Sequence, residues 1–189
     1  MRIFIAIALP KEIRVVLTRL QEELKKYYLG IKWVNPDYLH LTLMFLGEVR
    51  QDKISNIIQK IQEVAFCEKK VEVSLSQLGA FPNIRHPKVI WVGINSGEKE
   101  IAAIACKLQA CLEKLKTSEE KDFACHITLG RVKSFRDEPA FVDSLSSLNE
   151  NLCKEKLNFT ADKIIIYKST LTYKGPVYEA LKEITLKAT

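Results

Sequence analysis

Two histidines of this chain stand in the same four-residue pattern, His-x-Thr-x. The first copy is His40-Leu-Thr42-Leu, and the second is His126-Ile-Thr128-Leu. An imidazole has an ordinary pKa of about 6.5, so near neutral pH one histidine can be neutral while its twin is protonated. Such a pair is suited to general acid–base chemistry, in which one group removes a proton and the other supplies one.

Each copy of the pattern fits a β-strand. Side chains at positions i and i+2 of a strand point to the same face, about 7 Å apart, so the His and the Thr of each copy share a face. The aliphatic residues between them can anchor the strand in a core. Phosphoester cleavage needs a base for the attacking water and an acid for the departing oxygen, on opposite sides of phosphorus. Two histidines facing each other across a cleft meet this need without a metal ion, and Thr42 and Thr128 can donate hydrogen bonds to the non-bridging oxygens.

The other residues that could do chemistry fit less well. His86 lies between Arg85 and Pro87 without a Thr two positions later, and we expect it to be exposed. Neither His-x-Thr-x copy offers a second strong metal ligand at i+2, so the sequence predicts no metal site. Cys125 precedes His126, but adjacent strand residues point to opposite faces. We therefore expect Cys125 in the core and not as a nucleophile.

Hydrophobic periodicity indicates the elements that hold these residues. Several of the expected strand pairs lack a helical crossover, which predicts an α+β fold with antiparallel sheets. Pro10 suits the first turn of a helix, and Gly30 and Gly47 suit the ends of elements. The expected strands are 2–9, 39–46, 71–78, 89–94, 123–132, 157–167 and 177–186, and the expected helices are 10–27, 52–64, 101–115 and 139–148.

The length and the repeat indicate how these elements are organised. A chain of 189 residues suits one domain. The second histidine of the pattern follows the first after 86 positions (126 − 40), and each half supplies strands and helices. We therefore expect a single domain over residues 1–189, with two pseudo-symmetric βα lobes and antiparallel sheets around a central active-site cleft.

Composition narrows the setting in which the protein works. The 29 Lys and Arg against 23 Asp and Glu give a net charge of +6, which either attracts a polyanion or reflects solvated helix faces. The 5 cysteines include no Cys-x-x-Cys pair and lie among apolar residues, as buried thiols do in reducing compartments. No apolar run has the length of a signal peptide or a membrane span. We expect a cytoplasmic monomer without membrane contact.

The two motifs and their flanks resemble the RNA 2′,3′-cyclic phosphodiesterases, also called 2′-5′ RNA ligase-like proteins, of the 2H phosphoesterase superfamily. The resemblance covers nearly the whole length. The segments that carry it are Arg2-Ile-Phe-Ile-Ala-Ile, His40-Leu-Thr-Leu-Met-Phe-Leu-Gly-Glu48, Leu78-Gly-Ala-Phe-Pro-Asn83, Val89-Ile-Trp-Val-Gly93, His126-Ile-Thr-Leu-Gly-Arg-Val-Lys133, Ser169-Thr-Leu-Thr and Gly175-Pro-Val-Tyr-Glu179.

The resemblance implies hydrolysis of an RNA or nucleotide 2′,3′-cyclic phosphate to a 2′-phosphomonoester, with no cofactor. It implies that His40 is the proton donor and His126 the acceptor, an order that the residues alone leave open. Arg131 matches a basic position near the phosphate, although a surface arginine is the alternative. Phe81 matches a loop aromatic that could stack on a base or simply anchor its loop. The chain departs from the family at Met44, where relatives often carry Lys or Arg.

Two other functions use the same residues. The first is RNA end-joining, the reverse reaction, which forms a 2′-5′ linkage from a cyclic phosphate and a 5′-hydroxyl. Water is far more concentrated than an RNA hydroxyl, so we expect hydrolysis to dominate. The second is an RNA-end binding module without turnover. The intact His and Thr of both copies argue against a module, because a pure binder has no use for a proton donor and acceptor.

Overall fold

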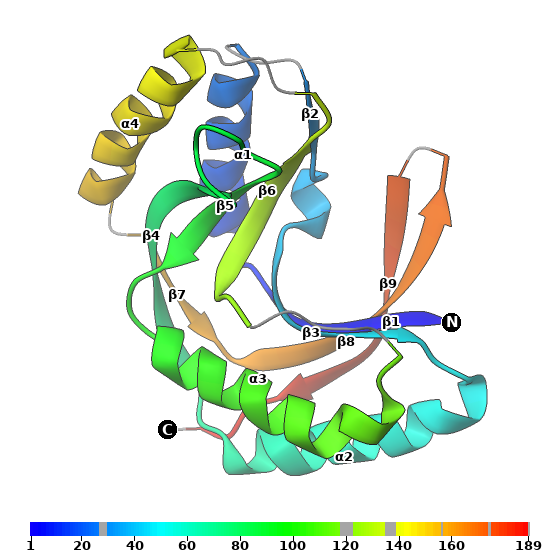
Figure 1. Cartoon of the computed structure of the whole chain (residues 1–189). Helices are drawn as coiled ribbons and strands as arrows, with labels where there is room; N and C mark the ends of the chain where they lie inside the picture. The colour runs from blue at the N-terminus through cyan, green and yellow to red at the C-terminus, as the bar shows by residue number, and fades with distance from the viewer. Residues whose placement is uncertain (27–29, 118–122, 135–138, 156, 174, 189) are drawn as a thin grey trace.

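The computed structural model of the chain describes residues 1–26, 30–117, 123–134, 139–155, 157–173 and 175–188 (Figure 1). It confirms the predicted α+β fold with antiparallel strands and two lobes. Its strands are β1 (Arg2–Ala8), β2 (Ile31–Trp33), β3 (His40–Glu48), β4 (Val71–Phe81), β5 (Val89–Ile94), β6 (His126–Val132), β7 (Asn158–Ala161), β8 (Lys163–Thr172) and β9 (Gly175–Thr185). Its α-helices are α1 (Lys11–Lys25), α2 (Ile54–Cys67), α3 (Glu98–Leu112) and α4 (Pro139–Lys154).

The strands form one curled sheet with three strands on either side of a central pair. The order is β7-β4-β5-β6-β3-β1-β8-β9, with β2 paired to β6 off this path. The central pair, β3 and β6, carries the two His-x-Thr-x copies, and Leu41 of one lies opposite Ile127 of the other. These are the residues between His and Thr in each copy. The approximate twofold axis that relates the two halves of the sheet therefore passes between the two motifs.

The two sequence halves exchange strands. Strand β4 belongs to the first half of the chain but pairs with β7 of the second half as well as with β5, whereas β8 and β9 belong to the second half and β8 pairs with β1 of the first. One lobe therefore contains β1, β3, β8 and β9, and the other contains β4, β5, β6 and β7. Neither lobe is a continuous piece of the chain, which the repeat in the sequence does not reveal.

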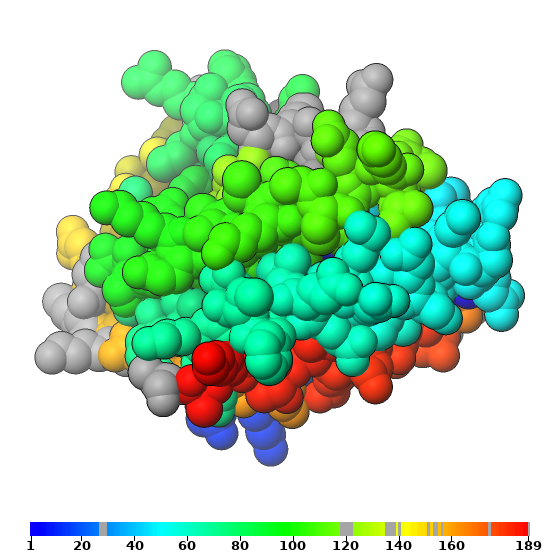
Figure 2. All heavy atoms as spheres, turned by 90° about the horizontal axis from the view of Figure 1, so that it is seen from below, coloured from blue at the N-terminus to red at the C-terminus, as the bar shows by residue number. Residues whose placement is uncertain are grey.

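The helices cover the outer faces of the two lobes, because each has one apolar stripe. In α1 the buried side chains include Ile13, Leu17, Leu20 and Leu24. Helices α2 and α3 lie together under the lobe of β3 and β9, and α1 and α4 lie beside the other lobe (Figure 1). Figure 2 shows the side chains of α2 and α3 side by side on the lower surface, with the C-terminal end of the chain along their edge. Among the described residues, no helix covers the inner face of the central strands.

Several boundaries differ from those predicted. The stretch 157–167 forms two strands, β7 and β8, which are separated at Asp162; β7 is one edge of the sheet, and β8 lies in the other half beside the edge strand β9. Gly47 was predicted to end its strand, but it lies inside β3 with a φ of 78°, where the pairing with β1 is irregular. This left-handed conformation suits glycine at a β-bulge. Helix α4 continues to Lys154, and the three-residue strand β2 is too short to show alternation.

Two further expectations concern thiols and membranes. The prediction of buried thiols is wrong for Cys67 and Cys106, which are exposed on α2 and α3. Cys111 and Cys125 are partly buried, and these four cysteines are free. Within the ranges described, no helix has the combination of length and apolarity that a bilayer span requires.

Candidate active site

The register of the central strand pair brings both motifs to one face of the sheet. With Leu41 opposite Ile127, continuing the antiparallel ladder by one residue in each direction places His40 opposite Thr128 and Thr42 opposite His126. All four side chains then point to the same face, and the histidines are diagonal neighbours about 7–8 Å apart. The charge of His126 also lowers the pKa of His40, which agrees with this proximity.

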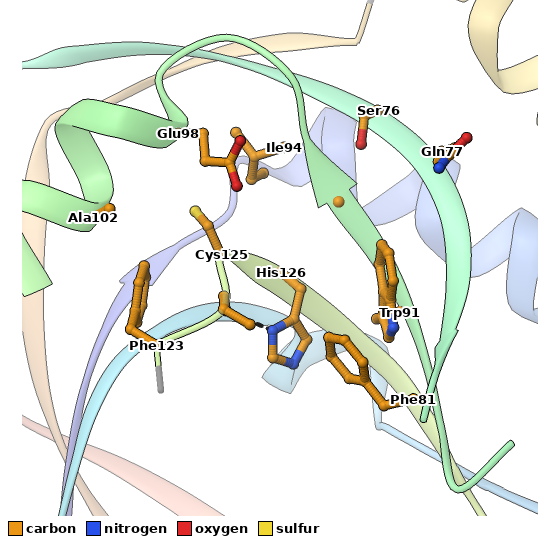
Figure 3. A pocket seen from close by; sticks show the side chains of 12 residues that line it. Ser76, Gln77, Phe81, Trp91, Ile94, Glu98, Ala102, Phe123, Cys125 and His126 are labelled. Carbon is orange, nitrogen blue, oxygen red and sulfur yellow. Dashed lines mark hydrogen bonds between the residues drawn. The ribbon is translucent and has the colours of Figure 1, made fainter. Parts of the chain in front are cut away.

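Each imidazole is held by the same kind of hydrogen bond. Nδ1 of His40 lies 2.7 Å from the carbonyl oxygen of Tyr38, and Nδ1 of His126 lies 2.7 Å from that of Ala124 (Figure 3). A carbonyl oxygen only accepts, so Nδ1 carries a proton and donates it. The other ring nitrogen, Nε2, is therefore the atom that each histidine offers to a substrate.

Burial lowers the pKa of both histidines. For His40, burial has the largest effect, the hydrogen bond to Tyr38 opposes it, and the charge of His126 adds to it. For His126, burial is again largest, the bond to Ala124 opposes it, and the positive charge of Arg131 lowers the pKa further. Neutral imidazoles are thus favoured in the free protein. A bound phosphate anion would favour the protonated form of whichever histidine acts as the acid.

Arg131 reaches the inner face through an irregularity in β6. Strict alternation from Thr128 would turn position 131 to the opposite face. In the pairing of β6 with β5, Ile90 lies opposite Gly130 and Trp91 opposite Thr128, so Leu129 is skipped. This extra residue in β6 restores Arg131 to the face of the motif. The guanidinium is exposed, and its effect on the pKa of His126 indicates that it is near the imidazole. Contact between Arg131 and a phosphate stays a prediction.

The equivalent irregularity in β3 explains the position of Met44. Its side chain is fully buried, with 0% of its surface exposed, and it packs in the core. Phe45 lies instead on the inner face, paired with Phe4 as Arg131 is paired with Val89. The departure from the family pattern at Met44 therefore leaves the charge of the inner face unchanged here. One copy of the motif has a cation at this place, and the other has a phenyl ring.

Aromatic residues that the sequence did not point to surround His40. The ring centroids of Phe4, Tyr178 and Tyr167 lie 4.9, 5.6 and 6.3 Å from that of His40. A cavity of about 140 Å³ adjoins them, and its lining also includes Arg14 of α1. These residues come from β1, β8, β9 and α1, so no spacing along the chain could have linked them to the motif.

A larger cavity, of about 410 Å³, lies beside His126 (Figure 3). Phe81 forms part of its wall and meets His126 edge-on, with ring centroids 5.1 Å apart and planes at 88°. Trp91 stands next to Phe81, with centroids 5.0 Å apart. Phe81 is therefore a wall of the cavity and not only a loop anchor, although stacking on a base is untested.

The indole of Trp91 lies against the sheet because two glycines leave room for it. A Cβ added at Gly79 would come within 2.4 Å of an indole carbon, and one at Gly93 within 3.1 Å. Trp91 belongs to the cavity lining, although the His-x-Thr-x pattern gives no indication of this role. The sequence signal for this role of Trp91 is the presence of Gly79 and Gly93 in the two neighbouring strands β4 and β5, because glycines leave space for a large ring.

Cys125 packs against the core, as predicted, but it is only partly buried because it also lines this cavity. It is partly buried, and burial, followed by the negative charge of Glu98, raises the pKa of its thiol to about 12. The thiol is therefore protonated near neutral pH and is a poor nucleophile. His86 is exposed, as predicted.

A buried glutamine fastens helix α1 to the second motif. Gln21 has 1% of its surface exposed, and its Nε2 donates to the carbonyl oxygens of Val34 and Leu129, each at 2.9 Å. Leu129 directly follows Thr128, so this amide supports the strand that carries the second His and Thr.

In the part of the chain that the structure describes, no group of three His, Cys, Asp or Glu could hold a metal ion.

Comparison with known proteins relates this site to a family. The sequence model of the family described as LigT like Phosphoesterase matches the chain twice, at residues 7–91 and 92–178. The RNA 2′,3′-cyclic phosphodiesterase of Methanocaldococcus jannaschii is 34% identical over 187 residues, which covers 97% of this chain and 99% of that protein. The protein of the same name from Archaeoglobus fulgidus is 35% identical over 182 residues, covering 96% and 98%. The crystal structure of TT0787 of Thermus thermophilus aligns with a TM-score of 0.83 and 28% identity, covering 100% of this chain and 99% of that one.

Proposed function

This chain belongs to the LigT-like phosphoesterase family, and on that basis we propose that it hydrolyses RNA 2′,3′-cyclic phosphate ends to 2′-phosphomonoesters by metal-independent acid–base catalysis. The observation that carries the proposal is the pairing of Leu41 with Ile127, which sets both His-x-Thr-x copies on one face. The name shared by the two relatives described above supports the reaction and its substrate class. The two Nδ1–carbonyl hydrogen bonds support the roles of the histidines, because they leave both Nε2 atoms available.

In this mechanism, Nε2 of neutral His126 removes a proton from a water molecule as its oxygen attacks phosphorus. The bond from phosphorus to the 3′ oxygen breaks, and protonated His40 gives its proton to that oxygen. The phosphate stays on the 2′ oxygen as a monoester. The hydroxyls of Thr42 and Thr128 donate to the non-bridging oxygens, and Arg131 stabilises the charge that develops on them.

The charge of Arg131 supports the order of the two roles. A guanidinium near His126 favours the neutral imidazole, which is the form that a base needs. Beside the first motif, Phe45 takes the place that Arg131 has beside the second, so His40 has a phenyl ring where His126 has a cation. This asymmetry agrees with His126 as acceptor and His40 as donor.

The test is incubation of a nucleoside 2′,3′-cyclic phosphate with the protein in EDTA, followed by phosphorus NMR of the product. We expect full activity and a 2′-phosphate. Activity that the chelator abolishes and added metal restores would reject the metal-independent mechanism, and a 3′-phosphate product would reject the direction of ring opening. Adding an oligonucleotide with a 5′-hydroxyl to the same assay measures end-joining, which we expect to be minor.

We further propose that the protein acts as a monomer. Both histidines and the lining residues of both cavities come from one chain. Size-exclusion chromatography with light scattering should give a mass near 21.6 kDa, and a mass near twice this value would contradict the monomer.

A further inference from the structure

The cavity beside His126 has an aromatic side and an acidic end. Phe81 and Trp91 form its wall close to the imidazole, while Glu98 and Ser76 lie at the end away from Phe81 (Figure 3). Glu98 is in the first turn of α3, and Ala102, one turn later, lines the same cavity. This face of the helix therefore presents one carboxylate to the cavity and leaves space beside it.

The lining indicates which part of a nucleotide the cavity suits. No Lys or Arg occurs among the described residues that line it, and the Glu98 carboxylate would repel a phosphate. A volume of about 410 Å³ is within the range of small-molecule sites. Flat aromatic rings next to the catalytic histidine suit a planar, uncharged nucleobase. The phosphate would then lie between the histidines, with the base extending toward Glu98.

The carboxylate also discriminates among bases. A carboxylate near neutral pH only accepts hydrogen bonds, and none of the ion pairs found among the described residues occupies Glu98. Guanine presents two adjacent donors, N1–H and the 2-amino group, on its Watson–Crick edge. Adenine and cytosine place an acceptor nitrogen beside their amino group, and uracil places its one N–H between two carbonyl oxygens. Guanine alone can give a carboxylate two parallel hydrogen bonds.

A second observation places the carboxylate at the cavity. The negative charge of Glu98 raises the pKa of Cys125, a residue of the same lining next to His126. Glu98 is thus close enough to influence a group beside the catalytic histidine. The hydroxyl of Ser76 lies at the same end and can accept a further hydrogen bond from a base.

We propose that this cavity receives the base of the nucleotide that bears the cyclic phosphate, and that Glu98 gives the enzyme a preference for guanine. The inference rests on the proposed function, because the histidines place the phosphate and thereby the base. Glu98 is a specificity-determining residue in this view, and it takes no part in the transfer of protons.

The test compares kcat/KM for the 2′,3′-cyclic monophosphates of guanosine, adenosine, cytidine and uridine. For the native protein we expect guanosine to exceed adenosine by roughly 10-fold or more, the usual size for one bidentate contact to a base. The Glu98→Gln variant should reduce this ratio to about 1 or invert it, because an amide accepts one hydrogen bond and donates another, which matches adenine.

Glu100→Gln is the matched control. Glu98 and Glu100 are both exposed in the first turn of α3, but only Glu98 lines the cavity, so Glu100→Gln should leave the ratio as in the native protein. Equal kcat/KM for the four bases, or a guanosine preference that Glu98→Gln leaves unchanged, would overturn the inference.

Failure of the proposed function would look different. If none of the four cyclic nucleotides is hydrolysed, the reaction is wrong, and calorimetric titration with guanosine 2′-monophosphate and adenosine 2′-monophosphate still tests the cavity. A tighter Kd for the guanosine nucleotide that Glu98→Gln removes would support the base preference. Equal Kd values would overturn it.

Discussion

The two histidines have different surroundings although their strands pair through equivalent residues. His40 is enclosed by aromatic rings of β1, β8 and β9. His126 has Phe81 and Trp91 on one side and the positive charge of Arg131 nearby. Equal motifs in unequal environments are what an acid and a base require, because each must hold a different protonation state at the same pH.

Replacing either histidine should remove most of the activity. We expect His40→Ala and His126→Ala each to lower kcat by at least about 100-fold, the usual contribution of general acid–base catalysis. The double variant should lose little more than the worse single variant, because the two groups act as one unit. His86→Ala, at an exposed position, is the control and should keep native kcat. Retained turnover in either variant would reject the role assigned to that histidine.

The pH dependence follows from the direction of the two pKa shifts. In the free enzyme, the base must be neutral and the acid protonated, and burial lowers the pKa of both groups. We therefore expect kcat/KM to peak below about pH 6.5 and to fall at higher pH as His40 loses its proton. The bound phosphate favours the protonated histidine, so the profile of kcat should lie at higher pH. A kcat/KM maximum above about pH 7 would contradict this assignment.

Individual elements were predictable wherever alternation or helical periodicity was long. The strand Val89–Ile94 has the predicted limits, and both motifs lie on strands as expected. The faces of Met44 and Arg131 were not predictable, because the bulges that turn them arise from pairing with β1 and β5. The same holds for Tyr178, whose contact with His40 depends on tertiary structure alone.

The contact between α1 and β6 should matter for stability. Gln21→Leu keeps a similar side-chain volume but removes both hydrogen bonds that the amide donates. The carbonyl oxygen of Leu129 still accepts a hydrogen bond from the backbone N–H of Val34, whereas the carbonyl oxygen of Val34 loses the bond from Gln21. We expect the free energy of unfolding to fall by about 1–3 kcal/mol in urea titrations. Gln59→Leu, on the exposed side of α2, should change it by about 0.5 kcal/mol or less. Equal effects in the two variants would show that the buried amide contributes nothing special.

At the scale of the whole molecule, the exchange of β4 and β8 joins the two halves. We propose that residues 1–189 form one domain, because each lobe lacks a strand without the other half. Urea unfolding followed by circular dichroism and by tryptophan fluorescence should give one shared transition. Fragments 1–91 and 92–189 produced separately should be unfolded. Two separated transitions in the full chain, or a folded single fragment, would contradict this organisation.

The pairing of Leu41 with Ile127 also affects how movements of the protein change the distance between the two histidines. If the acid and the base stood on hinged bodies, every opening movement would change the gap between them. Here two neighbouring strands carry the two histidines, and the bridge between Leu41 and Ile127 joins those strands at the point between the motifs. We therefore expect movements of the outer hairpins and loops to leave the distance between the two imidazoles unchanged, so that one pair of histidines can act on substrates of different size.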